Sequence, residues 1–321
     1  MAIVAEISDI SLLDRGRECT AAVRGERQDA VVVCQRAYQD NQDPVIGVLL
    51  AKAKYAAGDK ATAEWLARQL VRTSQRSDAL HILGQLAHAN NKDDEAVTAF
   101  EQARQLHSLE HRPWEVADDA WSLALIRARR NEFAEALQLA DECIKQAQLA
   151  GDPLLQRRGH LTAAKTLIRV GYWHAAEKEL DDASLVATTN TGRADVEYQR
   201  ASFYQEQGEH HQARAHFEKA LRYNEGSQDS LWTLNTELNL AYSLAEEGRL
   251  GDAQARLAEA ALLDSGHDKE PERAWVAARI AYRQHDLVSA ASLIEKYFKL
   301  VSADESVDRD DQIDVATLGA R

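Results

Sequence analysis

Residues 83–103, LGQLAHANNKDDEAVTAFEQA, show the layout on which most of the chain is built. A small residue, Gly84, lies in one helical pattern, and Ala96 lies near the start of the next. Asn91 falls in the short polar turn between them, while Phe100 and Ala103 continue the apolar face of the second pattern at helical spacing. This spacing predicts a hairpin of two helices that cross at small residues.

The same layout recurs every 33 to 40 residues. The alanines that open each second helix are Ala30, Ala63, Ala96, Ala136, Ala176, Ala213, Ala253 and Ala290. The residue four positions after each of these alanines is apolar, and the residue twelve positions before is small, except at Glu18. Five repeats carry a glycine five positions before the alanine, where a left-handed conformation can end the first helix: Gly25, Gly58, Gly171, Gly208 and Gly248. One hairpin cannot bury its apolar face alone, so neighbouring hairpins must stack.

This series of small, glycine, alanine and apolar positions resembles the tetratricopeptide repeat family, for example at Ala201, Gly208, Ala213, Phe217 and Ala220. The resemblance covers nearly the whole chain and implies an all-α fold, a right-handed α-solenoid of about eight helix hairpins. The predicted ranges are a lead-in at 1–10, a superhelix at 11–302 and an acidic tail or linker at 303–321. Within the superhelix the predicted repeats are about 11–43, 44–76, 77–112, 113–152, 153–191, 192–226, 227–266 and 267–302.

Most repeats are longer than the 34 residues usual in that family. The extra residues fall between hairpins, and Pro113 and Pro153 lie early in two of these segments. Because proline suits the first turn of a helix, the first helices of these repeats should begin about one turn early. The polar segment 187–192, ATTNTG, lacks helical spacing and predicts a longer loop before the sixth hairpin, and 224–227 and 265–268 predict loops before the next two.

Charge, hydropathy and cysteine usage restrict the class of protein. The net charge of −14 argues against nucleic-acid binding, and no apolar run approaches the length of a membrane span. The N-terminal residues lack the basic region of a secretory signal. The three cysteines, Cys19, Cys34 and Cys143, form no CxxC pair, and two of them occupy core positions of the repeat. We interpret them as reduced residues of a cytoplasmic protein.

The sequence offers no catalytic motif. It contains no phosphate-binding glycine loop, GxSxG or HExxH, and it predicts a protein that is not an enzyme and has no cofactor. Histidines raise the question of a metal, because His107 and His111 are four residues apart and His210, His211 and His216 cluster. Zinc needs three or four ligands, and neither group has an obvious carboxylate or thiolate partner. We therefore predict no metal site and interpret these histidines as surface residues at hairpin ends.

In the family that the chain resembles, one face of each first helix lines a concave groove. On that face basic side chains outnumber acidic ones, although the chain as a whole is acidic. The predicted partner-binding residues are Lys52, Tyr55, His81, Gln85, His88, Trp121, Arg129, Lys165, Arg169, Tyr198, Tyr242, Trp275, Arg279, Tyr282 and Arg283. Such a groove would bind a protein or peptide and would favour an acidic segment, because cations pair with carboxylates and aromatic rings provide flat contact area. Alternatively, the aromatic residues pack between hairpins and the charges are simply solvated.

Two functions fit this pattern. The first is a non-catalytic protein–protein interaction scaffold. The second is an N-terminal sensor or regulatory arm of a larger bacterial effector, such as a caspase-like peptidase, kinase or ATPase, that controls a downstream domain. The apolar residues 315–321, after an acidic segment at 304–314, favour the second function because they suggest that another element follows. The groove positions include no asparagine of the kind used in chaperone carboxylate clamps, so a heat-shock-protein clamp is not expected.

Overall fold

The computed structural model describes residues 16–23, 27–227, 229–266 and 269–303, and every regular element among them is an α-helix. Residues 16–23 are helical. The helices that follow are α2 (Ala30–Asn41), α3 (Pro44–Ala56), α4 (Lys60–Leu70), α5 (Arg76–His88), α6 (Asp93–Leu109), α7 (Pro113–Arg129), α8 (Phe133–Ala150), α9 (Pro153–Arg169), α10 (Trp173–Val186), α11 (Asn190–Glu206), α12 (His210–Tyr223), α13 (Ser230–Glu246), α14 (Leu250–Leu263), α15 (Glu270–Arg283) and α16 (Leu287–Ala303). None of these helices is long and apolar enough to cross a membrane.

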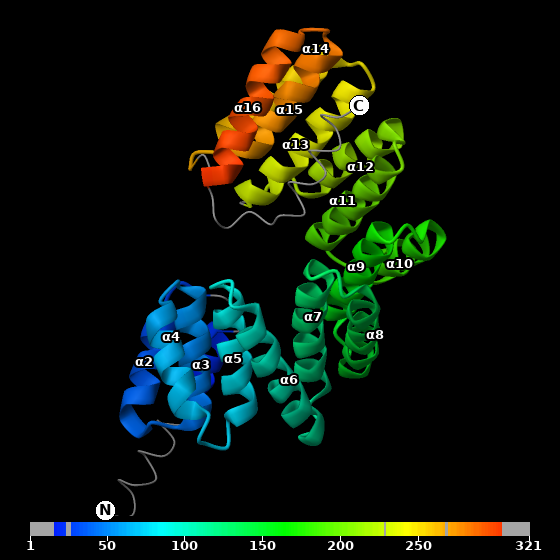
Figure 1. The fold of residues 1–321 in the computed structure, drawn as a ribbon. Coiled ribbons are helices and arrows are strands. Elements are labelled where there is room, and N and C mark those ends of the chain that lie inside the picture. Colours follow the sequence, from blue (N-terminus) through cyan, green and yellow to red (C-terminus); the bar gives the residue numbers. More distant parts are fainter. Residues whose placement is uncertain (1–15, 24–26, 228, 267–268, 304–321) are drawn as a thin grey trace, which may run out of the picture. The chain divides into compact units, whose positions relative to one another are not determined.

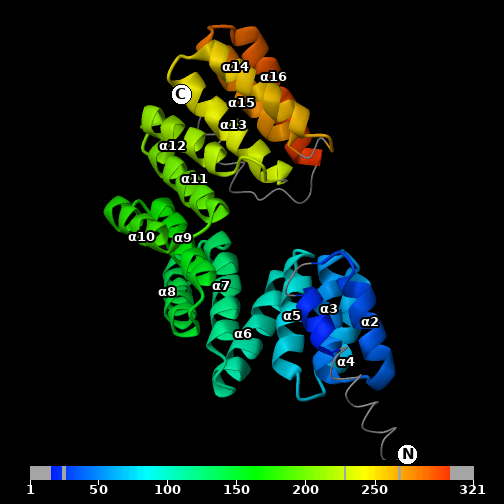
Figure 2. The same ribbon diagram turned by 180° about the vertical axis from the view of Figure 1, so that it is seen from behind.

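The chain divides into two units, Met1–Thr166 and Leu167–Arg321, each with its own buried core. Within each unit, consecutive helices pack as hairpins, such as α5 with α6 and α13 with α14 (Figure 1). The view from behind shows the same neighbours side by side (Figure 2). First helices also contact each other directly, α3 with α5 and α13 with α15. The predicted all-α fold of stacked helix hairpins is confirmed.

Gly84 and Phe100 show why small residues are needed where two helices cross. Gly84 on α5 is buried, and a Cβ atom placed on it would lie 2.8 Å from the Phe100 ring on α6. Phe100 is 1% exposed, and Ala96 and Ala103 on the same face are fully buried. The ring therefore fills the space that the missing side chain leaves, as the repeat pattern predicts.

The turn inside each described hairpin has a left-handed residue at the predicted position. Glycines occupy it at Gly58, Gly171, Gly208 and Gly248, with φ between 75° and 81°. Asn91, Asn131 and His285 occupy the same position in the remaining described turns, with φ of 56°, 62° and 63°. The repeat therefore fixes the backbone conformation even where the glycine is replaced, and asparagine tolerates that conformation better than most residues.

The first helices lengthen as predicted. Helices α7 and α9 begin at Pro113 and Pro153 and have 17 residues, whereas α3 and α5 have 13. The predicted longer loop at 187–192 is wrong, because α11 already begins at Asn190. The Thr189 hydroxyl accepts a hydrogen bond from the Gly192 amide at 3.0 Å, so this polar segment caps a helix. The predicted lead-in at 1–10 and residues 304–321 of the predicted tail lie outside the described residues.

The interpretation of all three cysteines as reduced is wrong for two of them. Cys19, in the helix at 16–23, and Cys34 on α2 form a disulfide bond across the first hairpin. Both are fully buried, and their Cα atoms are 4.7 Å apart, because they face each other where the two helices cross. A separation of 15 residues carries no disulfide signature, so the sequence did not show this pair. The cytoplasmic interpretation relied on reduced cysteines and loses that support. Cys143 is a free, buried thiol, as predicted.

Candidate functional site

All fifteen residues predicted to bind a partner lie on the first helix of a hairpin (Figure 1). In the first unit these are Lys52 and Tyr55 on α3, His81, Gln85 and His88 on α5, Trp121 and Arg129 on α7, and Lys165 on α9. In the second unit they are Arg169 on α9, Tyr198 on α11, Tyr242 on α13, and Trp275, Arg279, Tyr282 and Arg283 on α15. Their environments differ, and several make contacts within the protein.

Lys52 in the first unit is part of an ion-pair network that joins three first helices. Its Nζ atom lies 3.4 Å from Oδ1 of Asp78 on α5. Arg112, the residue before α7, donates to both oxygens of the same carboxylate at 2.7 and 3.2 Å. Burial alone would raise the pKa of Asp78, but Arg112 and Lys52 hold that pKa below its usual value. Lys52 therefore shares a buried carboxylate with Arg112.

The sequence predicted that His81 lies on an open groove surface. The side chain is instead buried, with 6% of its surface exposed. Its Nδ1 atom lies 2.6 Å from Oδ1 of Asp119, and its Nε2 atom lies 3.3 Å from Oδ2 of Asp118. His107, interpreted from the sequence as a surface histidine without a carboxylate partner, is 1% exposed and lies 2.7 Å from Oδ2 of Asp119. Both interpretations are wrong because α7 inserts a fully buried carboxylate between the two helices of the preceding hairpin.

At the other end of α5, Asp93 on α6 connects two predicted groove residues. The Asp93 carboxylate lies 3.5 Å from Nδ1 of His88 and also pairs with Arg129 on α7. Arg129 in turn donates to His88 at 3.4 Å. Trp121 is half-buried beneath the guanidinium group of Arg158, 4.5 Å from the ring centroid. This cation–π contact occupies one face of the indole ring.

The remaining predicted residues of the first unit differ in exposure. Tyr55 is half-buried and packs against the core around α3 and α4. Gln85 is half-buried, whereas Lys165 is exposed. Arg169, which belongs to the second unit, is exposed as well.

The second unit brings five groove-face residues together on α13 and α15. Glu246 pairs with Arg279 and lies 3.3 Å from a guanidinium nitrogen of Arg283. The guanidinium carbon of Arg279 is also 5.8 Å from the centroid of the Tyr282 ring. The pKa of the Tyr242 phenol is raised, mainly because the side chain is buried and also because the Glu246 carboxylate is nearby. We call Tyr242, Glu246, Arg279, Tyr282 and Arg283 the α13–α15 cluster.

A pocket of about 460 Å³ adjoins this cluster. It is lined by Glu246, Glu247, Gly248, Tyr282, Arg283, His285 and Leu287. Tyr282 is 52% exposed and Leu287 is 63% exposed, so an aromatic and an aliphatic side chain are accessible here. Glu247 is already paired with Arg214, at 2.9 Å. The pocket thus combines accessible apolar surface with the guanidinium group of Arg283.

Two predicted aromatic residues pack between helices instead, as the alternative interpretation held. The Tyr198 hydroxyl accepts a hydrogen bond from Asn239 at 3.0 Å, and its ring contacts Phe217 edge-on at 5.6 Å. The Trp275 ring lies 5.9 Å from the ring of Tyr297 on α16. Both side chains are half-buried and pack against neighbouring helices.

The excess of positive charge on the predicted face is largely balanced inside the protein. Asp78, Asp93 and Glu246 each pair with at least one predicted groove cation. Most of these pairs join residues of neighbouring repeats, 26 to 36 positions apart. A search of each groove position for acidic residues about one repeat away would have found them.

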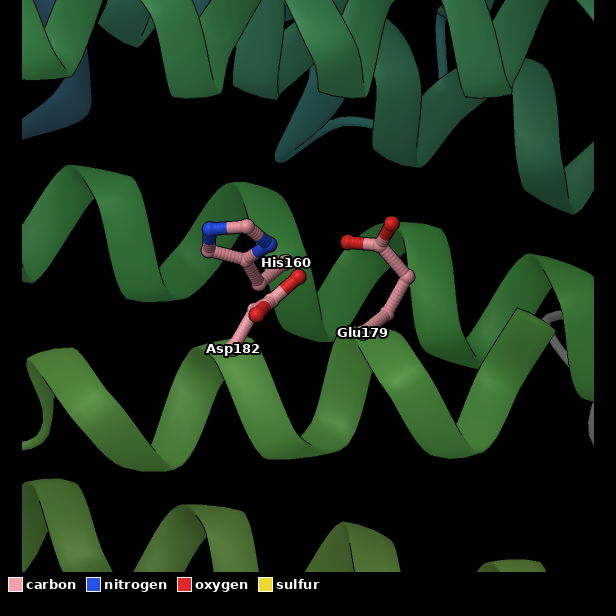
Figure 3. Close-up of side chains that lie close together, drawn as sticks. All are labelled: His160, Glu179 and Asp182. Atoms are coloured by element: carbon pink, nitrogen blue, oxygen red, sulfur yellow. The ribbon is translucent and has the colours of Figure 1, made fainter. Parts of the chain in front are cut away.

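The second group of histidines also has a carboxylate partner that the sequence did not reveal. Glu197 on α11 is 9% exposed, and its Oε2 atom lies 2.6 Å from Nδ1 of His216. Figure 3 shows three further side chains of types that bind metals, His160 on α9 and Glu179 and Asp182 on α10. His160 belongs to the first unit and the two carboxylates to the second, so we do not assign them to a common site.

Comparison with known proteins supports the repeat assignment. The family model described as tetratricopeptide repeat matches residues 192–264. Comparison with curated proteins gives no match. Among solved structures, a Rap protein complexed with Competence and Sporulation Factor is 11% identical, with a TM-score of 0.69 over 90% of this chain and 87% of that one.

Three further structures share the fold. The apo quorum sensor NprR from B. thuringiensis is 13% identical, with a TM-score of 0.66 over 96% of this chain and 99% of that one. Another NprR structure is a complex with its cognate peptide NprX. A STAND protein from Pyrococcus horikoshii with a tetratricopeptide repeat sensor is 12% identical, with a TM-score of 0.68 over 94% of this chain and 48% of that one.

Proposed function

Because the chain is a tetratricopeptide-repeat protein, we propose that it is a non-catalytic scaffold that binds a protein or peptide segment on its first helices. The observation that carries this proposal is the α13–α15 cluster with its adjoining pocket. Exposed aromatic rings and arginines are the side chains that most often dominate the binding energy of protein interfaces. Similar structures of a Rap protein and NprR hold a factor and a peptide, which fits the same role.

The cluster favours a partner segment that carries a carboxylate. Within the α13–α15 cluster, the two guanidinium groups of Arg279 and Arg283 share one carboxylate, that of Glu246. Each guanidinium group has five N–H donors in a planar array, so the pair can hold a second carboxylate without releasing the first. An apolar side chain next to that carboxylate would contact Tyr282 and Leu287. The proposed ligand is therefore an acidic segment with neighbouring apolar residues.

The test is affinity capture followed by mass spectrometry with matched variants. In the Tyr282→Ala/Arg283→Glu variant, the proposed surface loses its most accessible aromatic ring and reverses one charge. Arg249→Glu is the control, because Arg249 is exposed on the adjacent turn and pairs locally with Asp252. A protein captured by wild type and by the control, and lost from the double variant, is the expected result. Equal capture by all three, with circular dichroism spectra that match, would refute the proposal.

A second candidate is a sensor or regulatory arm of a larger effector. The similar STAND protein favours it, because that protein carries a tetratricopeptide repeat sensor and this chain covers about half of its length. In this role, binding at the α13–α15 cluster would change the activity of a downstream domain. The discriminating observation is whether the native reading frame continues beyond Arg321 into such a domain.

A further inference from the structure

We propose that the junction of α5, α6 and α7 is a protonation-controlled joint, closed while the His81 ring carries protons on both nitrogens. The joint consists of His81 on α5, His107 on α6, and Asp118 and Asp119 on α7. It connects the two helices of one hairpin to the first helix of the next. This role is independent of the partner proposed above.

The geometry of His81 defines its protonation state. Nδ1 lies 2.6 Å from a carboxylate oxygen of Asp119, and Nε2 lies 3.3 Å from a carboxylate oxygen of Asp118. Nδ1 is hydrogen-bonded to Asp119, and because an ionised carboxylate only accepts hydrogen bonds, Nδ1 carries a proton. A neutral ring with its single proton on Nδ1 would leave the bare lone pair of Nε2 3.3 Å from the Asp118 carboxylate, so both contacts are favourable together only in the imidazolium form.

Asp119 makes the joint a connection among three helices. It is fully buried, and its two oxygens are divided between His81 and Nδ1 of His107, the latter at 2.7 Å. The Nε2 atom of His107 is buried without a hydrogen-bond partner among the described residues, so His107 is tied to the joint through Nδ1 alone. The other side of His81 contacts the Phe100 ring edge-on at 5.4 Å, which links the joint to the core of the hairpin.

The surrounding charges favour the protonated ring. Burial and the positive charge of Lys52 on α3 oppose it, whereas Asp118 and Asp119 on α7 favour it. On α5 itself the carboxylate of Asp78 is near His107 and is paired with Arg112 and Lys52. Burial is the largest effect and lowers the pKa of His81, but the two α7 carboxylates together outweigh it and raise the pKa above 6.5.

The direction of the pH effect follows from the sign of this shift. A raised folded-state pKa means that the charged His81 contributes stability fully below pH 6.5, and that this contribution is lost as the pH rises through the folded-state value. Above that value, a bare nitrogen lone pair on Nε2 faces the Asp118 carboxylate. Two acceptors then oppose each other, and the contact between α5 and α7 loosens.

The test compares wild type with Asp118→Asn and Asp94→Asn in urea unfolding between pH 6 and pH 9. An asparagine amide at 118 can donate to the bare Nε2 nitrogen, so this variant accommodates neutral His81. Asp94 on α6 has a side chain that is 94% exposed and pairs with Arg130, the residue after α7, so Asp94→Asn removes a nearby surface carboxylate without touching His81 and serves as the control. We expect the unfolding midpoint to fall with rising pH in wild type and in Asp94→Asn, and to change much less in Asp118→Asn.

Nitrogen-15 NMR of the histidine rings gives a second measurement, made on the wild-type protein. Wild-type His81, assigned by comparison with His81→Gln, should retain both ring N–H groups above pH 6.5. The joint is disproved if His81 titrates at or below that value. It is equally disproved if Asp118→Asn keeps the wild-type dependence of the midpoint on pH.

Discussion

Replacing Gly84 by leucine tests the contact that defines the repeat. A Cβ atom at this position would lie 2.8 Å from two carbons of the Phe100 ring, closer than non-bonded carbon atoms can approach. Phe100 is 1% exposed and cannot turn into solvent without leaving a cavity. The only other adjustment is to move α5 away from α6, which separates the helices of the third hairpin.

Two opposing effects determine the size of the change. Leucine is a better helix former than glycine, which stabilises the variant by about 0.5–1 kcal/mol. Inserting a side chain into a packed core costs about 1–3 kcal/mol. We therefore expect a net loss of about 1 kcal/mol, and at most about 2.5 kcal/mol, from the free energy of unfolding.

Gly251→Leu separates the two effects, because nothing lies within 4 Å of a Cβ atom at Gly251 on α14. This control should leave the unfolding free energy unchanged or raise it by up to about 1 kcal/mol. The assay is urea unfolding followed by circular dichroism, with hydrogen exchange of α5 and α6 to locate the loss. If Gly84→Leu unfolds at the wild-type urea concentration or above it, the assigned crossing of α5 and α6 is wrong.

Three further outcomes follow from buried groups. The Cys19–Cys34 disulfide closes a loop of about 15 residues, so reducing it should lower the free energy of unfolding by about 3 kcal/mol. Reductant should therefore lower the urea midpoint of wild type but not that of a Cys19→Ala/Cys34→Ala variant. Burial raises the pKa of the Cys143 thiol to about 12, so iodoacetamide at pH 8 should label Cys143 only after denaturation, as judged by mass spectrometry. At pH 7, Glu197→Gln should lower the unfolding free energy by about 1–2 kcal/mol, whereas Glu237→Gln should not. Burial alone would raise the pKa of Glu197, but its hydrogen-bonded neighbours outweigh burial and lower that pKa. Burial raises the pKa of Glu237, so its ionised form is not stabilised by folding. The Glu197 contribution is present above pH 4.5 and is lost as the pH falls through its lowered folded-state pKa, which acid titration of wild type and Glu197→Gln would show.

The hairpins could be predicted because their requirements are local and repeat along the chain. A small residue at each crossing, an apolar residue one turn into the second helix and a left-handed turn residue are all needed to bring two helices together. The repeats from the second onward show the small and apolar residues at the same spacing, and Asn91 and His285 occupy the turn position that holds a glycine in other repeats. The loop at 187–192 was mispredicted because polar residues suit a loop and a helix N-terminus equally well.

The binding surface was harder to predict because a side chain's availability depends on residues from other repeats. The family pattern shows which positions share a face, and it placed Tyr242, Arg279 and Arg283 correctly on first helices. It could not show that Asp119 buries His81, because that contact joins residues 38 positions apart. The disulfide was missed for the same reason, since Cys19 and Cys34 meet only after the first hairpin has formed.

The buried polar residues also explain how nearly identical hairpins can keep their own partners. Small and apolar residues at shared positions allow any first helix to pack against any second helix. A buried glutamate lies four positions before the small residue of the first helix in two repeats, but its partner differs between them. Glu197 on α11 binds His216 on α12, whereas Glu237 on α13 lies 3.3 Å from Arg256 on α14. Exchanging two second helices would leave a buried carboxylate with a partner at a different distance, and a buried charge without a well-placed partner is strongly destabilising. The apolar positions therefore stabilise stacking in general, while these polar pairs favour the native pairing of each hairpin.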